Sequence, residues 1–340
     1  MLRVKQFSML MLITLFSMSY ANAMEDKAAS AEALYQQAVI PYEQGWNKGL
    51  DLMLQAANAG NIKALCLIAR GYQGTSLIVN ADAQTYFKKA AELGGLCGMQ
   101  ALSNLGSGPI LDASLSDHSG DQNWTEVLLE TAKKRADEGQ LDGLRSYALI
   151  QAAKGNGNGF CKWMEKAADL GDADAMNQLA GAIRDGCGWY LIPGSRDKAV
   201  RHWIEQAANN GNPRAMDQLA VYYQEAGDIK SMLHWYGMGA NIGNVNSILF
   251  YSGYLMSALE LGVEVPLELQ DKVKAYGLLN AVVSQITEDD NVFSAYHQAI
   301  ERMRFLEKVL TAEELDEAKK WSNEWMKTHQ VRSYFLEFGM

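Results

Sequence analysis

The chain alternates amphipathic stretches with short polar turns, and its apolar residues have the spacing of helices. After Gly171 the apolar positions are the fourth, fifth, eighth and twelfth: Ala175, Met176, Leu179 and Ile183. Residues at this spacing fall on one face of an α-helix. An alanine pair ends another helical stretch just before Gly171. The pattern therefore predicts two helices joined at the glycine, which readily adopts the left-handed backbone that ends a helix.

This helix–glycine–helix unit is repeated along most of the chain. Six turn glycines mark the copies, at spacings of 34, 45, 32, 40 and 32 residues: Gly60, Gly94, Gly139, Gly171, Gly211 and Gly243. An aromatic residue stands eight positions before four of them: Tyr86, Trp163, Trp203 and Trp235. The paired alanines let two helices approach closely, and the aromatic fills the space between units. Because one hairpin cannot bury its apolar face alone, the copies must stack into a solenoid.

These units resemble the Sel1-like repeats, which are relatives of the tetratricopeptide repeat. The signature between units is present in Gly71-Tyr72-Gln73-Gly74, followed by Asn80-Ala81-Asp82 and Tyr86-Phe87, and again in Asp197-Lys198-Ala199 before Trp203. The third unit departs from the pattern, with Thr131 in the aromatic position. The resemblance covers roughly residues 45–285. It implies an all-α fold, a right-handed α-solenoid of stacked helix-turn-helix repeats, and a role in protein–protein interaction.

The pattern divides the chain into four parts. We predict a signal peptide over 1–23, an N-terminal cap helix over 24–44, the repeat solenoid over 45–285 and a C-terminal helical cap over 286–340. Inserted loops are expected at 104–123 and 185–196, where turn-forming residues interrupt the repeats. Thr311 and Glu314 form a capping box at the start of the last amphipathic helix. Such a capping helix prevents open-ended stacking of repeats.

The first residues have the features of a secretory signal peptide. Arg3 and Lys5 precede a mostly apolar run over residues 7–18, and Ala21-Asn22-Ala23 is a small-x-small cleavage sequence. The run is too short for a comfortable membrane span. We therefore expect cleavage after Ala23 and a periplasmic protein, with an uncleaved anchor or release from the cell as alternatives. The net charge of −10 disfavours generic binding to a nucleic-acid backbone.

The cysteines predict at least one disulfide. An exported chain with an even number of cysteines is expected to pair them: Cys66, Cys97, Cys161 and Cys187. Cys161 lies ten residues before Gly171 and Cys187 lies sixteen after it, so they stand where the two ends of a hairpin meet. We predict a Cys161–Cys187 bridge that pins the second inserted loop. Cys66 and Cys97 stand on equivalent helices of adjacent units, where the usual helix spacing of about 8–10 Å is near or beyond disulfide reach. They are either bridged or two buried thiols.

Patterns that suggest enzyme chemistry have a simpler explanation in the repeat. Ser195 and Lys198 match the Ser-x-x-Lys pattern of serine acylating enzymes, but Lys198 belongs to the repeat signature. The glycine-rich stretch 155–159 precedes a helix without following a strand, which indicates a turn rather than a phosphate loop. His202 and His234 precede repeat tryptophans, and no further metal ligands accompany them. We therefore expect no catalytic residue, no metal and no cofactor.

Binding is therefore expected on surfaces. In related solenoids the face opposite the apolar stripe lines the concave side, and positions six and ten after the turn glycine lie on that face. These residues are predicted to contact a protein partner: Arg70, Arg145, Asn177, Asp217 and Val221. Trp189 and Tyr190 in the second inserted loop are further candidates, because Trp and Tyr dominate interface hot spots. They either anchor a partner or fold back over the solenoid edge.

Together these features predict a periplasmic, non-enzymatic protein-binding solenoid without a stable membrane span. Its acidic charge favours a partner with a basic patch. The resemblance to exported Sel1-like proteins implies, most specifically, an immunity protein that sequesters a lipase-type effector, a phospholipase of a type VI secretion system. An envelope scaffold or a regulatory adaptor is the alternative. A secreted factor that binds host proteins and a β-lactam-binding protein are less favoured.

Overall fold

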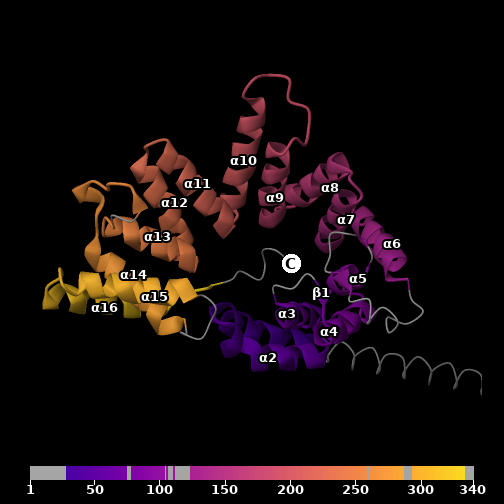
Figure 1. Ribbon diagram of the computed structural model, residues 1–340, viewed down its shortest axis with the longest axis horizontal. Helices are drawn as coiled ribbons and strands as arrows, with labels where there is room; N and C mark the ends of the chain where they lie inside the picture. Colours follow the sequence, from indigo (N-terminus) through magenta and orange to yellow (C-terminus); the bar gives the residue numbers. More distant parts are fainter. Residues whose placement is uncertain are drawn as a thin grey trace, which may run out of the picture.

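The computed structural model describes residues 28–74, 78–103, 105, 110–111, 123–258, 261–286 and 293–333, and the predicted signal peptide lies outside them. The fold is an all-α solenoid (Figure 1). Residues 28–44 are helical. The helices that follow are α2 (Trp46–Ala59), α3 (Ile62–Gln73), α4 (Ala81–Glu92), α5 (Leu96–Leu102), α6 (Trp124–Asp137), α7 (Leu141–Ala153), α8 (Gly157–Asp169), α9 (Ala173–Arg184), α10 (Ser195–Asn209), α11 (Pro213–Glu225), α12 (Ile229–Asn241), α13 (Val245–Leu255), α14 (Lys272–Gln285), α15 (Phe293–Leu306) and α16 (Ala312–Met326). A short 3-10 helix, η3, spans Leu267–Leu269.

A glycine turn separates the two helices of each predicted unit. The six turn glycines have φ values between 74° and 98°, a region that residues with a side chain rarely adopt. They separate α2 from α3, α4 from α5, α6 from α7, α8 from α9, α10 from α11 and α12 from α13. In most units the next residue then caps the second helix through its side chain: Asn61, Asp172, Asn212 and Asn244. The structure thus confirms the predicted repeat.

The two helices of a unit come close together at the fourth residue after the turn glycine. This residue is always small: Ala64, Gly98, Gly143, Ala175, Ala215 and Ser247. The three alanines have no solvent exposure. A Cβ atom added to Gly98 would lie 2.6 Å from the backbone nitrogen of Ala91. The size of this residue therefore sets the spacing of the pair, since a larger side chain would force the helices apart.

The helix pairs follow one another around a curve. Helices α3, α5 and α7 lie toward the inside of this curve, and α4, α6 and α8 lie toward its outside (Figure 1). The apolar core is a series of clusters shared between neighbouring pairs. One cluster continues from α7 to α11 through Leu144, Met164, Leu179 and Met216. Each pair is thus stabilised by the next, as the stacking of a solenoid requires.

Parts of the two predicted inserts and of the C-terminal cap lie among the described residues. In the first predicted insert, Ile110 and Leu111 form the short strand β2 (Ile110–Leu111), which pairs in parallel with β1 (Ile78–Val79). The second insert follows α9 and ends where α10 begins at Ser195, slightly before the predicted boundary. The predicted capping box is present at the start of α16. There Glu314 N donates to Thr311 Oγ1 at 3.2 Å, and Thr311 N donates to Glu314 Oε2 at 2.8 Å.

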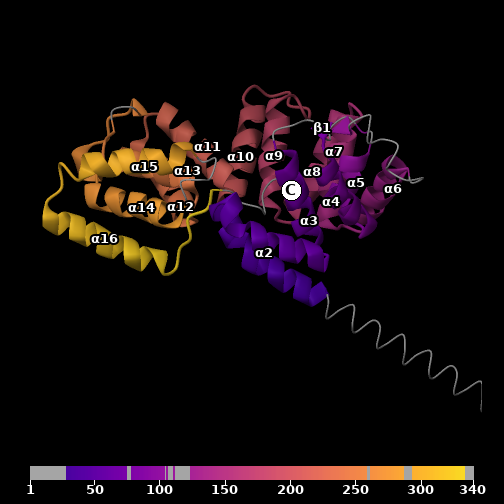
Figure 2. The same ribbon diagram turned by 60° about the horizontal axis from the view of Figure 1, so that its bottom comes forward.

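The two ends of the array lie side by side (Figure 2). Residues 330–333, which follow α16 and which we call the strap, connect them. On one side Arg332 forms an ion pair with Glu43, and Ser333 N donates to Glu43 O at 2.8 Å. On the other side Arg332 N donates to Gly243 O at 2.8 Å, and Val245 N donates to Arg332 O at 3.1 Å. The strap therefore joins the N-terminal helical segment to the turn between α12 and α13.

Candidate protein-binding surface

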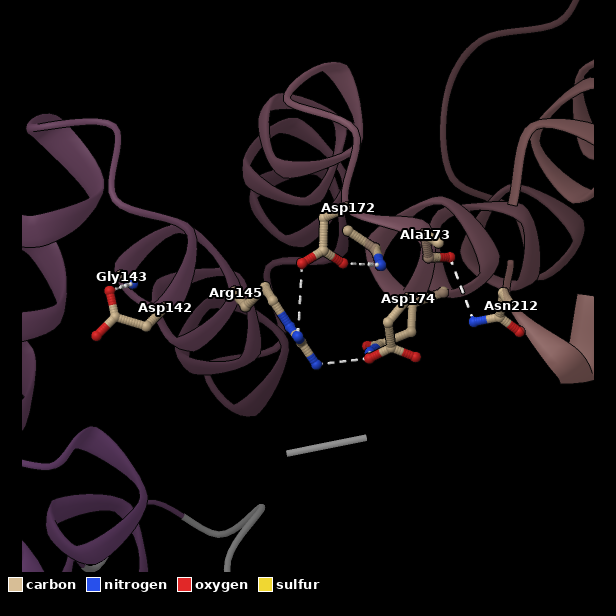
Figure 3. A network of polar contacts seen from close by, with 9 residues as sticks. Asp142, Gly143, Arg145, Asp172, Ala173, Asp174 and Asn212 are labelled. Atoms are coloured by element: carbon tan, nitrogen blue, oxygen red, sulfur yellow. Dashed lines mark hydrogen bonds and ion pairs between the residues drawn. The ribbon is translucent and has the colours of Figure 1, made fainter. Parts of the chain in front are cut away.

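Arg145, a predicted partner contact, joins two successive units (Figure 3). It extends from α7 to the start of α9, where its Nη2 lies 2.5 Å from Asp174 Oδ2 and its Nη1 lies 3.5 Å from Asp172 Oδ2. Asp174 is only 3% exposed and also accepts a hydrogen bond from Gln178 Nε2 at 2.8 Å. A buried carboxylate requires such partners. Arg145 therefore stabilises the stack of these two units.

Asn177 and Asp217, the equivalent residues in the next two units, make the same kind of link. Gln218 Nε2 on α11 donates to Asn177 Oδ1 on α9 at 3.2 Å. Ser247 Oγ on α13 donates to Asp217 Oδ1 on α11 at 2.6 Å. We call Arg145, Asn177 and Asp217 the inner ladder. Because each link joins the second helix of one unit to the second helix of the next, the inner ladder is continuous from α7 to α13.

The inner ladder ends at α13 in a group with shifted pKa values. Burial raises the pKa of Asp217 to about 6, and the hydrogen bond from Ser247 opposes this shift only in part. Tyr236 stacks on Phe250 and Tyr254, with ring centroids 5.3 and 5.4 Å apart. Burial, then Tyr254 and Asp217, raise the pKa of Tyr236. The phenol therefore stays neutral, while Asp217 changes charge close to neutral pH.

Arg70 and Val221, the remaining predicted contacts on this face, are accessible. Arg70 is exposed on α3, yet burial and then the positive charge of Arg145 lower its pKa. Val221 is 44% exposed on α11, one helical turn after Asp217. The structure therefore brings Arg70 near Arg145 and leaves Val221 available for contact.

Trp189 and Tyr190, predicted together, have different environments. Trp189 is 89% exposed in the loop between α9 and α10. Tyr190 folds back and is half-buried against the core that contains Met164 and Ile183. The guanidinium carbon of Arg196 lies 4.9 Å from the centroid of the Tyr190 ring. Trp189 is thus presented to solvent, whereas Tyr190 covers the solenoid edge.

Several surface residues were missed by the sequence analysis. Leu191 and Ile192 are 81% and 73% exposed beside Trp189. The sequence feature that could have revealed this apolar surface is the absence of any charged residue from 186 to 195. Asp172 and Asp174, which hold Arg145, were also missed. The sequence feature that could have revealed them is a pair of acidic residues at the start of a predicted helix.

Both cysteine pairs are disulfides in the structure. The Cα atoms of Cys161 and Cys187 are 6.6 Å apart, and those of Cys66 and Cys97 are 6.3 Å apart. Both separations lie within the usual range for disulfides. A Cα atom lies about 2.3 Å from its helix axis, so two facing Cα atoms can be within disulfide reach at the usual distance between helix axes. The bridge between Cys66 and Cys97 therefore exists without an unusual approach of α3 to α5. Two disulfides are typical of proteins in an oxidising, exported environment.

The described residues offer little for metal or acyl chemistry. Within the ranges given above, no cluster of three or more His, Cys, Asp and Glu side chains could hold a metal ion. Ser195 Oγ donates to Ile192 O at 2.6 Å, so it serves the turn before α10. His202 and His234 each lie edge-on against the neighbouring tryptophan, at 5.3 Å. Over the same part of the chain, no helix combines the length and the apolar character that crossing a membrane requires.

Comparison with known proteins gives a distant likeness. No family model and no curated protein matches the chain. A protective antigen of uropathogenic Escherichia coli strains, which displays an SLR fold, is 18% identical over 88% of this chain, with a TM-score of 0.43. This chain covers 62% of that antigen, less than two thirds of its length. A Sel1 repeat protein from Oxalobacter formigenes is 17% identical over 91% of this chain and 89% of its own, with a TM-score of 0.41. The assignment as a helical-repeat protein rests on the chain's own helix pairs.

Proposed function

We propose that this chain is a non-enzymatic protein-binding solenoid whose inner face holds another protein. The observation that carries the proposal is the inner ladder, whose polar side chains are fixed by bonds between the second helices of successive units. A surface that is already ordered loses little conformational entropy when a partner binds. Arg70 and Val221 add a charged and an apolar contact beside it.

We propose the periplasm as the compartment. Two observations support it: the pair of disulfides and the leader-like sequence that ends at Ala23. Disulfides persist in secreted and periplasmic proteins and are rare in the reducing cytosol. A partner in this compartment would meet an acidic chain of net charge −10, which favours a basic surface on that partner.

Within this class we propose an immunity protein that sequesters a phospholipase effector of a type VI secretion system. The support is the resemblance of the repeats to exported Sel1-like proteins, together with a preformed inner face that can cover an active site. An envelope scaffold or regulatory adaptor would use the same face on a different partner. The identity of the partner therefore decides between them.

A rescue experiment tests the immunity role. A phospholipase effector of a type VI secretion system is directed to the periplasm with and without the chain, and surviving cells are counted. We expect survival to require residues 1–23, since the chain must reach the compartment of the toxin. Failure of rescue, with no complex on co-purification, contradicts the immunity role.

A pair of variants tests the inner face separately. Arg70→Glu combined with Val221→Glu is expected to weaken binding of the effector at least about tenfold, because both residues change charge or polarity at the contact. Leu267→Glu is the matched control, since Leu267 is 83% exposed in η3, away from the inner ladder. Equal binding by both variants would place the contact elsewhere on the solenoid.

A further inference from the structure

Three large apolar side chains project together from the loop between α9 and α10. Trp189, Leu191 and Ile192 are 89%, 81% and 73% exposed, and we call them the apolar tip. The ten residues from 186 to 195 include no charged side chain. The loop protrudes beyond the helices around it at the top of Figure 1. Adjacent exposed apolar residues on a protruding loop are unusual unless they meet an apolar environment.

The base of this loop is firmly held. The Cys161–Cys187 disulfide attaches it to α8. Arg196 on α10 donates to Ile183 O and, at 3.0 Å, to Cys187 O, and it also stacks on Tyr190. These contacts hold the loop without covering the apolar tip. The disulfide and Arg196 therefore fix the base of the loop and leave the apolar tip exposed to solvent.

Shape and charge around the apolar tip point to a lipid surface. A protein would need a pocket complementary to a convex projection, whereas lipid adapts to it. The flanking residues 184–201 include four basic and two acidic side chains, a local positive excess in a chain of net charge −10. Arg184, Lys198 and Arg201 of this set are exposed, as are Asp185 and Asp197, so the exposed side chains keep a small positive excess. Apolar residues that insert into the headgroup region, with basic residues beside them, are the pattern of peripheral binding to anionic lipid.

We propose that the apolar tip docks this solenoid on an anionic lipid surface. Trp189, Leu191 and Ile192 enter the boundary between headgroups and acyl chains, and the exposed Arg184 and Lys198 face the lipid phosphates. This role is independent of the proposed function, because the tip lies on the α9–α10 loop and not on the inner ladder. A partner on the inner face would then be held close to a membrane.

Vesicle flotation tests the proposal. The chain that begins at residue 24 is mixed with vesicles of phosphatidylglycerol and phosphatidylcholine, or of phosphatidylcholine alone. We expect binding to the anionic vesicles that added salt weakens. Replacing Trp189, Leu191 and Ile192 together by Ser is expected to lower this binding at least about tenfold, because three apolar side chains lose their burial in lipid. Leu267→Ser, an equally exposed change elsewhere, is the matched control and keeps binding.

A second measurement places the tip in the bilayer without changing its polarity. Brominated lipids quench tryptophan fluorescence only at close range, and Trp189→Phe is expected to retain binding while losing most of this quenching. Three outcomes overturn the proposal: no binding of the unchanged chain to anionic vesicles, equal loss in Leu267→Ser, or unchanged quenching in Trp189→Phe. Capture of a protein partner that requires the tip, without vesicle binding, would assign the tip to that protein instead.

Discussion

Arg332 and Glu43 form a two-point ion pair between opposite ends of the repeat array. Arg332 Nε lies 2.5 Å from Glu43 Oε2, and Arg332 Nη2 lies 2.6 Å from Glu43 Oε1. Glu43 has no solvent exposure. A carboxylate buried to this extent depends on its partner, since removing one member leaves an uncompensated charge. The contact between the two ends is therefore strongly specified.

Replacing Arg332 by Ala is expected to destabilise the protein by about 3–5 kcal/mol, because Glu43 stays buried without its partner. Arg332→Lys is expected to cost less, since it keeps the charge but loses the two-point geometry. Urea unfolding followed by circular dichroism measures both. The matched control is Lys320→Ala, which removes an exposed ion pair with Asp316 and is expected to cost at most about 1 kcal/mol. Equal losses for Arg332→Ala and Lys320→Ala would contradict the role of the strap.

Asp217 predicts a specific pH dependence of stability. Its pKa is raised from 3.8 to about 6 by burial in the folded protein. Between these values the folded protein keeps a proton that the unfolded chain has released, so this group makes stability fall as the pH rises from about 4 to about 6. Asp217→Asn cannot ionise and keeps the oxygen that accepts from Ser247. This variant is expected to lack the slope and to be about 3 kcal/mol more stable at neutral pH. Parallel stability curves for the two proteins would contradict the assignment.

The disulfides predict a large difference between oxidised and reduced protein. Replacing Cys161 and Cys187 by Ser is expected to destabilise the protein by about 2–4 kcal/mol, because the bridge restricts the unfolded chain over a separation of 26 residues. The same change at Cys66 and Cys97, separated by 31 residues, is expected to have a similar effect. Peptide mapping of the non-reduced protein identifies the pairs directly. Mixed pairs between the two sets would contradict the structure.

Two glycines in helices are expected to respond oppositely to Ala. At Gly98 a new Cβ would overlap the backbone of α4, so Gly98→Ala is expected to destabilise by about 1–3 kcal/mol. At Gly181 in α9 nothing lies within 4 Å of the added atom. Gly181→Ala is therefore expected to stabilise the protein by about 0.5–1 kcal/mol through helix propensity. Thermal unfolding of both variants distinguishes a packing effect from a general effect of glycine removal.

The repeat could be predicted from the sequence because the residues that specify it lie close to one another along the chain. The turn glycines, the small residue four positions later and the Thr311–Glu314 capping box each specify the backbone around them. The Cys161–Cys187 bridge followed from the same local geometry, since both residues belong to one hairpin. The pairing of Cys66 with Cys97 could not be decided, because it depends on whether the two residues face each other across α3 and α5, which belong to different units.

The candidate surface was harder to predict, because its contacts depend on how successive units stack on one another. Arg145 was predicted as a partner contact, but its links to Asp172 and Asp174 require the register between two units. Trp189 and Tyr190 are adjacent in sequence, yet Arg196 draws only Tyr190 back to the core. The strap has no periodic pattern and makes its contacts across 289 residues. Contacts between residues so far apart in the chain produce no local sequence pattern.

The junction at Arg332 also limits how such a protein can evolve. An open row of helix pairs tolerates gain or loss of a copy, because each copy contacts only its neighbours. Here an additional pair would turn the array further and carry Glu43 away from Arg332. The number of copies is therefore expected to be constrained by the geometry of the junction, while sequence change within a copy remains free wherever the small residues are kept.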